Sequence, residues 1–236
     1  MSVALVTGAS RGIGRAIARR LASDGFDLFL VARDEAHLSE VVSEVKSTGR
    51  RAVASGVDLA LTDAPERIHS GFVTVFDHLD VLVNNAGVAI SREFGEYEAG
   101  DWDAVMNVNA RSPFFLTQLL LPLLRQASPG FIVNIASVVA KKGYELQSLY
   151  AASKHALLGF TKSLAREMVN EDIRVHAILP GGVNTEMVTG VRPDIDTSGL
   201  IGPEEVAEVV ANLLKMRGNA VIDEVEIRRR AKTPWA

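Results

Sequence analysis

Residues Val3–Leu21 read VALVTGASRGIGRAIARRL, in which a short apolar run leads into a glycine-rich turn and then into a segment of helical period. The glycines stand at positions 8, 12 and 14, so their spacing is GxxxGxG. Such glycines let the backbone approach a pyrophosphate, and the following helix offers its N–H groups and positive dipole end to the phosphates. A turn that only needs positive φ is the alternative explanation. Because this turn opens a strand–helix–strand pattern, dinucleotide binding is the favoured interpretation.

Short apolar runs alternate with longer amphipathic segments along the chain. Most of the runs are apolar throughout, which is typical of strands in a parallel sheet covered on both faces. This alternation predicts an α/β fold: one domain over residues 1–236, with a doubly wound, mostly parallel, seven-stranded sheet between layers of helices. The predicted strands are Val3–Thr7, Leu28–Ala32, Ala52–Val57, Val81–Asn84, Phe131–Ala136, Val175–Leu179 and a late one near Val221–Ile227.

Composition excludes several classes of function. The 236 residues carry a formal net charge of −4 and are 47% hydrophobic, so the sequence indicates neither a nucleic-acid partner nor an anionic membrane surface. The absence of cysteine excludes disulfides, thiolate catalysis and cysteine-ligated metals, and the five histidines lack the paired spacing of a metal site. No run is long enough to span a membrane and no signal-peptide pattern opens the chain. We therefore expect a cytoplasmic protein without a metal.

A tyrosine and a lysine stand four residues apart in SLYAASKHALLGF, residues 148–160. On a helix, the spacing i, i+4 places Tyr150 and Lys154 on one face, within reach of a common small molecule. The alternative is a tyrosine packed by its ring and a lysine whose ammonium reaches water. His155 points about 100° away from Lys154, so we expect it to be structural or solvated.

Four motifs occur together in the order and rough spacing of the short-chain dehydrogenase/reductase family. They are TGASRGIG at residues 7–14, NNAG at 84–87, YAASK at 150–154 and PGGVNT at 180–185. The resemblance covers nearly the whole chain. It implies a Rossmann-type domain that moves hydride between a nicotinamide cofactor and a carbonyl or alcohol. It also implies a homodimer or homotetramer, paired through helices such as Trp102–Gln126 and Gln147–Asn170.

The resemblance implies four catalytic residues. Tyr150 would deliver the proton, and Lys154 would lower the tyrosine pKa and hold the nicotinamide ribose. Ser137, at the end of the fifth predicted strand, would orient the substrate oxygen, although a plain turn cap is the alternative for this residue. Asn109 fits the fourth role better than Asn107 does, and would hold a water next to Lys154.

Two arginines favour NADP(H) over NAD(H). In the family alignment the selecting position falls on Arg33, and Arg11 lies inside the glycine loop. Guanidinium groups bind a 2′-phosphate bidentately and keep their charge, whereas an acidic residue would hold the free ribose of NAD. Asp34 is a rival for that acidic role, but capping the next helix explains it better.

Further contacts are implied by the resemblance. Asp58 would meet the adenine, Asn85 and Gly87 would pass the adenosine side, and Thr185 would bond the carboxamide or pyrophosphate. The full predicted cofactor set is Gly8, Ser10, Arg11, Gly12, Ile13, Gly14, Arg33, Asp58, Leu59, Asn85, Ala86, Gly87, Tyr150, Lys154, Pro180, Gly181, Val183 and Thr185. Residues 186–202 would form a substrate lid. The candidate substrate contacts are Ser137, Tyr144, Tyr150 and Met187, with Val188, Ala89 and Ile90 as further candidates.

Together these features predict an NADPH-dependent reductase of ketones or aldehydes. The alternative within the enzyme class is reduction of a 3-oxoacyl thioester on a carrier protein, which Arg125 and Arg166 could meet. The C-terminal segment NAVIDEVEIRRRAKTPWA departs from the glycine-rich ending common in such reductases, which puts that specialised function and a tetramer in doubt. A non-enzymatic NADP(H) sensor is the third hypothesis, disfavoured because all four catalytic residue types are present.

Overall fold

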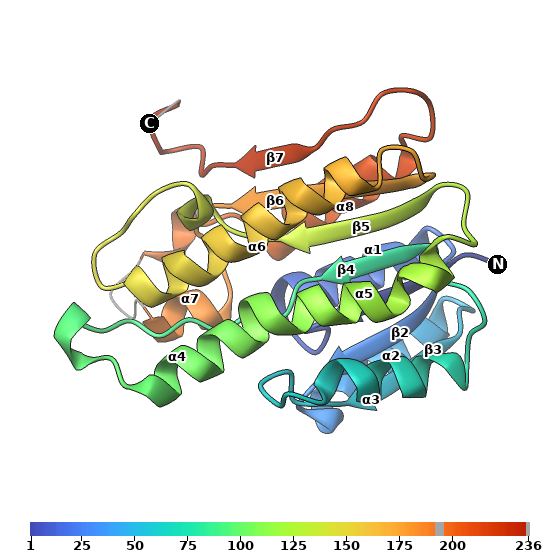
Figure 1. Ribbon diagram of the computed structural model, residues 1–236, viewed down its shortest axis with the longest axis horizontal. Helices are drawn as coiled ribbons and strands as arrows, with labels where there is room; N and C mark the ends of the chain where they lie inside the picture. The colour runs from blue at the N-terminus through green and yellow to red at the C-terminus, as the bar shows by residue number, and fades with distance from the viewer. Residues whose placement is uncertain (192–195, 235–236) are drawn as a thin grey trace.

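A seven-stranded sheet in the order β3-β2-β1-β4-β5-β6-β7 divides the molecule (Figure 1). The computed structural model describes residues 1–191 and 196–234. All six strand pairs are parallel, so the expected α/β fold is confirmed and its sheet is parallel throughout. The strands are β1 Val3–Thr7, β2 Asp27–Ala32, β3 Ala52–Gly56, β4 Val81–Asn84, β5 Gly130–Ile135, β6 Ile173–Pro180 and β7 Glu224–Ile227.

Helices cover both faces of this sheet (Figure 1). On one face lie α1 Gly12–Ser23, α2 Glu35–Ser47 and α8 Pro203–Lys215, and on the other α3 Ala64–Val73, α4 Ala99–Met106, α5 Ser112–Leu124 and α6 Ser148–Glu167. Helix α7, Glu186–Val191, lies beyond the carboxyl ends of the strands. Short 3₁₀ turns span Phe94–Glu96, Val138–Ala140 and Thr197–Gly199.

The predicted strand edges differ from the observed ones in a few places. β1 and β4 have the predicted bounds, whereas β7 begins at Glu224 instead of near Val221. β5 ends at Ile135, so Ser137 lies two residues beyond the strand, where it caps the 3₁₀ turn Val138–Ala140. The predicted lid, residues 186–202, contains positions 192–195, and the predicted domain contains 192–195 and 235–236, all of which lie outside the described residues.

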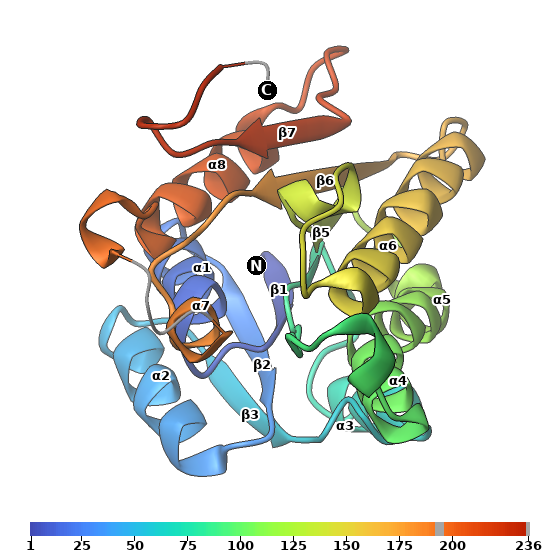
Figure 2. The same ribbon diagram turned by 90° about the vertical axis from the view of Figure 1, so that its left-hand side faces the viewer.

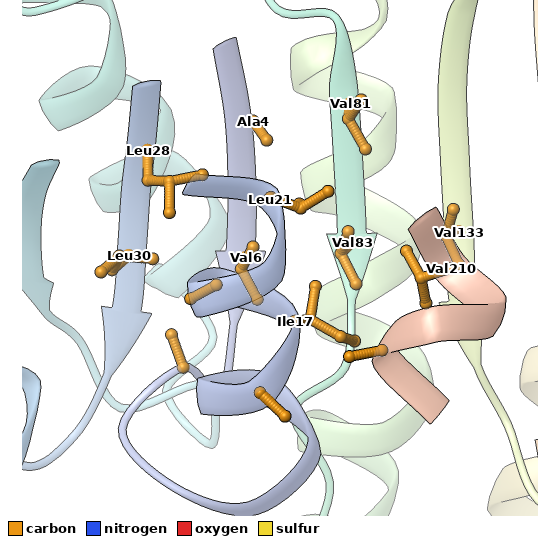
Figure 3. Packing of buried hydrophobic residues seen from close by; sticks show 14 of the residues in the cluster. Ala4, Val6, Ile17, Leu21, Leu28, Leu30, Val81, Val83, Val133 and Val210 are labelled. Atoms are coloured by element: carbon orange, nitrogen blue, oxygen red, sulfur yellow. The ribbon is translucent and has the colours of Figure 1, made fainter. Parts of the chain in front are cut away.

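Apolar side chains of α1 and α8 pack on one face of the sheet (Figure 3). Ile17 and Leu21 lie over β1 and β4, and Val210 of α8 lies near Val133 of β5. On the opposite face Phe29 of β2 meets Phe72 of α3 edge to face at 5.4 Å. Each fully buried side chain of this size contributes about 1.5–3 kcal/mol to folding. Burial on both faces explains why β1, β2, β4 and β5 are apolar almost throughout.

The chain order creates a crevice above the centre of the sheet. From β1 the chain proceeds outward through β2 and β3 and then returns to β4 on the other side of β1. The connections after β1 and β4 therefore run in opposite directions along the sheet and leave a gap between them. Open α/β sheets bind ligands at such a point, at the carboxyl ends of the strands. Figure 2 looks onto these ends, with the two helical layers on either side and α7 in front.

Helix α4 passes into α5 through a π-helical turn, Asn107–Arg111. The N–H group of Ser112 donates to the carbonyl of Asn107, five residues earlier. Such turns hold one residue more than a regular turn and often occur at functional sites. This one contains Asn109, whose side chain is fully buried. Among the helices that the structure describes, none is long and apolar enough to cross a bilayer.

Candidate active site

A cleft of about 750 Å³ opens at the carboxyl ends of the strands, beside the glycine loop. Its walls come from the loops after β1, β2, β3, β4, β5 and β6 and from α6 and α7, which are far apart in sequence. The predicted site residues that line it are Gly8, Ser10, Arg11, Gly12, Ile13, Arg33, Asp58, Leu59, Asn85, Ala86, Gly87, Ser137, Tyr150, Lys154, Pro180, Gly181, Val183, Thr185 and Met187.

Two glycines shape the glycine loop and the start of α1 beside the cleft. Gly8 has φ +65°, and a Cβ there would stand 2.9 Å from the Cα of Ala86. Gly14 does not line the cleft; a Cβ on it would stand 2.1 Å from the carbonyl oxygen of Gly8. Gly14 therefore lets the first turn of α1 pack against the loop, which aims the helix N-terminus into the cleft.

The loop after β4 is fastened to the glycine loop by an amide. Asn85 Nδ2 donates to the carbonyl oxygens of Thr7 at 2.9 Å and Gly8 at 3.2 Å. The hydroxyl of Thr7 accepts from the N–H groups of Asn85 and Ala86. These bonds fix two walls of the cleft relative to one another, so Asn85 positions the backbone as well as lining the site.

Ser137 and Tyr150 meet on the substrate side. Ser137 Oγ accepts from the N–H of Val139 at 3.3 Å and donates to the carbonyl of Pro180 at 3.5 Å, so it is both a cap and part of the cleft wall. Burial raises the pKa of Tyr150 to about 12, and a hydrogen bond with Ser137 offsets part of that rise. As a residue Tyr150 is partly exposed, because it faces the cleft.

Lys154 is buried, with 3% of its surface exposed, and its Nζ donates to the carbonyl of Ile135 at 2.9 Å. Burial lowers its pKa to about 8. The pKa of Tyr150 is raised overall instead of lowered, because desolvation of the phenol dominates; the lowering effect of the Lys154 charge stays a prediction. The ammonium lies 5.9 Å from the centre of the tyrosine ring. The i, i+4 spacing thus brings the two groups together, but the dry environment favours their neutral forms.

Asn109 lies behind the cleft wall instead of lining it. Its Oδ1 accepts from the N–H of Val88 at 2.8 Å, and its Nδ2 donates to the carbonyl of Val88 and the hydroxyl of Ser153. Both amide protons are therefore used in holding the loop after β4 against α6. A Cβ on Gly87 would stand 3.5 Å from both Asn109 Oδ1 and Lys154 Nζ, so the two groups flank that glycine. Asn107 instead donates to the carbonyl of Ala60, as a structural residue.

Four arginines gather at the opposite end of the cleft, and three have close carboxylate partners. Arg11 pairs with Glu186 of α7. Arg15 bonds Glu44 at 2.5 Å, and Arg19 lies 3.8 Å from the same glutamate. The fourth, Arg33, approaches Asp58 only to 4.0 Å, and its side chain is 65% exposed. Among the described residues it is the arginine of this cleft with the loosest ion pair.

The cleft includes residues that sequence reasoning missed and omits some that it proposed. The lining residues that the sequence analysis does not propose are Arg15, Arg19, His37 and Glu186. The three charged ones pair with residues of other segments, which no local sequence pattern indicates. Only His37 has a local indication, because it follows Asp34 by three residues. Tyr144 is 48% exposed and stands outside the lining, as do Ala89 and Ile90, whereas Val188 lines the cleft. The described residues hold no group of three or more side chains that could bind a metal.

A family model described as short chain dehydrogenase matches residues 2–196. The chain belongs to this family. It is 36% identical to a 3-oxoacyl-acyl-carrier-protein reductase of Aquifex aeolicus, over 94% of each chain. A metagenomic short-chain oxidoreductase solved in complex with NADP shares 35% identity, over 98% of each chain, with a TM-score of 0.85. An alcohol dehydrogenase of Thermococcus sibiricus solved with 5-hydroxy-NADP superposes with a TM-score of 0.90 over 99% of each chain, at 28% identity.

Members of the short-chain dehydrogenase family use a nicotinamide cofactor, and the cleft fits one. The glycine loop offers close backbone approach and the N-terminus of α1, both suited to a pyrophosphate. Arg33 lines the cleft after β2, whereas the proton-transfer groups line it from α6 and from the loop after β5, on the other side of β1 and β4. The donor chemistry of both ends therefore matches the two ends of a dinucleotide.

Proposed function

We propose that this member of the family is an NADPH-dependent reductase that converts a ketone or aldehyde into an alcohol. The observation that carries the proposal is the convergence of Ser137, Tyr150 and Lys154 on the cleft that the glycine loop and Arg33 also line. The bound cofactor supplies hydride. The chain's own residues bind it, orient the carbonyl and provide the proton.

Arg33 is the residue proposed to hold the 2′-phosphate. Its loose contact with Asp58, at 4.0 Å, leaves the guanidinium available for a bidentate phosphate contact. Arg11 has the weaker claim, because its ion pair with Glu186 must break first. Asp34 caps α2 through Oδ1, as expected from sequence, and its Oδ2 lies 2.6 Å from His37 Nδ1, so it does not present a free carboxylate to a ribose.

The proton is proposed to come from the Tyr150 hydroxyl. With a pKa of about 12 the phenol is fully protonated at neutral pH and can donate to the substrate oxygen as negative charge develops there. Ser137 orients that oxygen by a second hydrogen bond. Lys154, with a pKa of about 8, carries its charge at pH 7, where it favours the phenolate left by proton transfer.

The deciding experiment is NADPH oxidation by the purified protein with aldehydes, aromatic ketones, vicinal diketones and a 3-oxoacyl thioester. Tyr150→Phe should bind NADPH normally and lose about 10²–10⁴-fold in turnover. Tyr97→Phe is the matched control, because its hydroxyl bonds the backbone of Ile90 and Leu146 and lies outside the cleft. Near-normal turnover in Tyr150→Phe would overturn the assigned acid. NADPH binding without any turnover would favour the sensor hypothesis.

Reduction of a 3-oxoacyl thioester is the second candidate, favoured by the similarity to the Aquifex enzyme. The structure weakens one argument for it. Arg125, proposed to meet an acidic carrier protein, makes two bonds to Glu171 at 2.6 and 2.8 Å, whereas Arg166 remains exposed. A kcat/KM for the thioester well above that for small ketones would establish this candidate, and the reverse order would exclude it.

A homo-oligomer remains part of the proposal. Phe114 and Phe115 on α5 are 44% and 37% exposed, and Phe114 lies 5.0 Å from the ring of Phe160 on α6. Exposed aromatic groups of this kind are enriched at protein interfaces. Light scattering on the purified protein tests this: a monomer at micromolar concentration would contradict it.

A further inference from the structure

An acidic side chain stands beside the proposed phosphate-binding arginine. Asp34 follows Arg33 directly in the chain, and both residues line the cleft. A free carboxylate at this place repels a 2′-phosphate and instead accepts hydrogen bonds from the ribose hydroxyls of NAD(H). The preference for NADPH therefore depends on what engages Asp34.

Both oxygens of Asp34 contact one residue, His37. Oδ1 accepts from the backbone N–H of His37 at 3.1 Å, which caps α2. Oδ2 lies 2.6 Å from His37 Nδ1. The backbone bond and then the side-chain bond hold the pKa of Asp34 below its usual range, so the carboxylate stays ionised and paired.

Other nearby groups leave this pairing undisturbed. The carboxylate of Glu35 packs against the backbone of Gly56 on β3, where a Cβ would stand 2.3 Å from it. Asp58 accepts from the N–H of Ala60 and faces Arg33. His37 lines the cleft beside Asp34, and their side chains are 60% and 50% exposed, so the pair faces the open space together.

We propose that His37 is a cofactor-specificity residue that favours NADPH over NADH. Its imidazole holds Oδ2 of Asp34 away from the ribose site. The cap bond of Asp34 needs only the backbone of residue 37, whereas the second bond needs the imidazole. Removing the imidazole thus frees one carboxylate oxygen while α2 keeps its cap. This proposal rests on the proposed use of NADPH at the same cleft.

The test is the ratio of Kd values for NADH and NADPH, measured by nicotinamide fluorescence without any substrate. His37→Leu should lower the preference for NADPH by about two- to fivefold, the range expected for an exposed charge pair. The effect should shrink as salt is raised from about 20 to 300 mM, because the charges are exposed. His37→Asn, which keeps a donor at the position of Nδ1, should retain the wild-type ratio.

Two further variants separate charge from structure. His37→Leu combined with Asp34→Asn removes the repelling charge and keeps an acceptor for the cap, so the ratio should return to that of wild type. His69→Leu, on α3 and outside the cleft, is the matched control. An unchanged ratio in His37→Leu, or a changed ratio that Asp34→Asn does not reverse, would overturn the role of His37. A wild-type preference for NADH would instead overturn the proposed NADPH use.

Discussion

The two ends of the cleft differ in how their charged and polar groups are stabilised. At the catalytic end Lys154 and Asn109 are buried, and burial shifts the pKa values of Tyr150 and Lys154 toward their neutral forms. At the arginine end the side chains of Arg11 and Arg33 are exposed and that of Arg15 is partly exposed, and ion pairs hold the charges. Burial makes each charged group at the first end costly to hold, whereas water screens the groups at the second.

This difference teaches where reactivity and where selectivity reside. A dry end fixes protonation states strongly, so single substitutions there should act on rate and on stability together. At the exposed end, single substitutions should change cofactor affinity by small factors that decrease at high salt. Four predictions test this contrast, in order of decreasing effect.

The largest effect is expected from Lys154→Met. It removes the buried ammonium and should reduce turnover by about 10²–10⁴-fold. It should also stabilise the fold by about 1–2 kcal/mol at pH 7, because a pKa lowered from 10.5 to about 8 means that the folded state disfavours the charge. Between pH 8 and 10.5 the unfolded chain binds more protons than the folded one. The stability of the wild type should therefore rise over this range and approach that of Lys154→Met.

Urea unfolding of both proteins from pH 7 to 10.5 measures that rise. Lys162→Met, on the same helix but with a 61% exposed side chain, is the matched control and should change neither quantity substantially. A less stable Lys154→Met at pH 7 would contradict the burial penalty.

Gly14→Ala should have the next largest effect. The new Cβ would stand 2.1 Å from the Gly8 carbonyl oxygen and 2.5 Å from Asn85 Nδ2, so the glycine loop must move. We expect a loss of about 1–3 kcal/mol in stability and at least about tenfold in NADPH affinity. Gly159→Ala is the control: this helical glycine has nothing within 4 Å of its Cβ position, so alanine should stabilise α6. Equal behaviour of the two variants in calorimetry would refute the packing role.

A pH profile probes the dry end without mutation. Carbonyl reduction should proceed at a constant kcat/KM from pH 6 to about 7.5 and fall about tenfold per unit above pH 8, as Lys154 loses its proton. Tyr150, with a pKa of about 12, stays protonated over this range and adds no further limb. Stopped-flow measurement of NADPH oxidation checks this, and a flat profile to pH 10 would show that the charge of Lys154 is not needed.

The smallest effect is expected at the exposed end. Arg33→Ala should weaken NADPH binding by about five- to tenfold and leave NADH binding nearly unchanged. Arg11→Ala should cost only about twofold, because Glu186 already occupies that guanidinium. Arg67→Ala on α3, outside the cleft, is the control. Isothermal titration calorimetry with both cofactors at low salt measures these affinities. A larger loss of NADPH affinity in Arg11→Ala than in Arg33→Ala would reverse the assignment.

Much of the fold could be predicted because its strands are buried on both faces. Val3–Thr7 and Val81–Asn84 were predicted with their observed bounds, since each is a continuous apolar run that ends at a polar or glycine-rich turn. β6 spans Ile173–Pro180 and so begins before the predicted Val175–Leu179, because Arg174 separates Ile173 from the apolar run. A half-exposed edge strand such as β7 has no continuous apolar run, so the sequence does not indicate that it begins at Glu224.

Apart from what the family resemblance implies, the sequence indicates the site only where its residues are close along the chain. The Tyr150–Lys154 spacing and the cap by Asp34 are local, and the structure places both as predicted. Pairing between Arg11 and Glu186 joins segments 175 residues apart, and no local pattern reports it. The pKa of Tyr150 was also beyond reach, because the direction of its shift depends on how much of the phenol the fold removes from water.

The π-helical turn at Asn107–Arg111 determines which way the side chains of α5 face. One residue corresponds to about 100° of helical rotation, so the additional residue turns α5 by that angle relative to α4. Its inward consequence is Asn109, which faces the loop after β4, and its outward one is the exposed pair Phe114 and Phe115. A single-residue deletion here would change the composition and the length of the helical segment by only one residue. It would nevertheless rotate the aromatic pair away from its present direction, so one backbone irregularity governs both the site and the outer face.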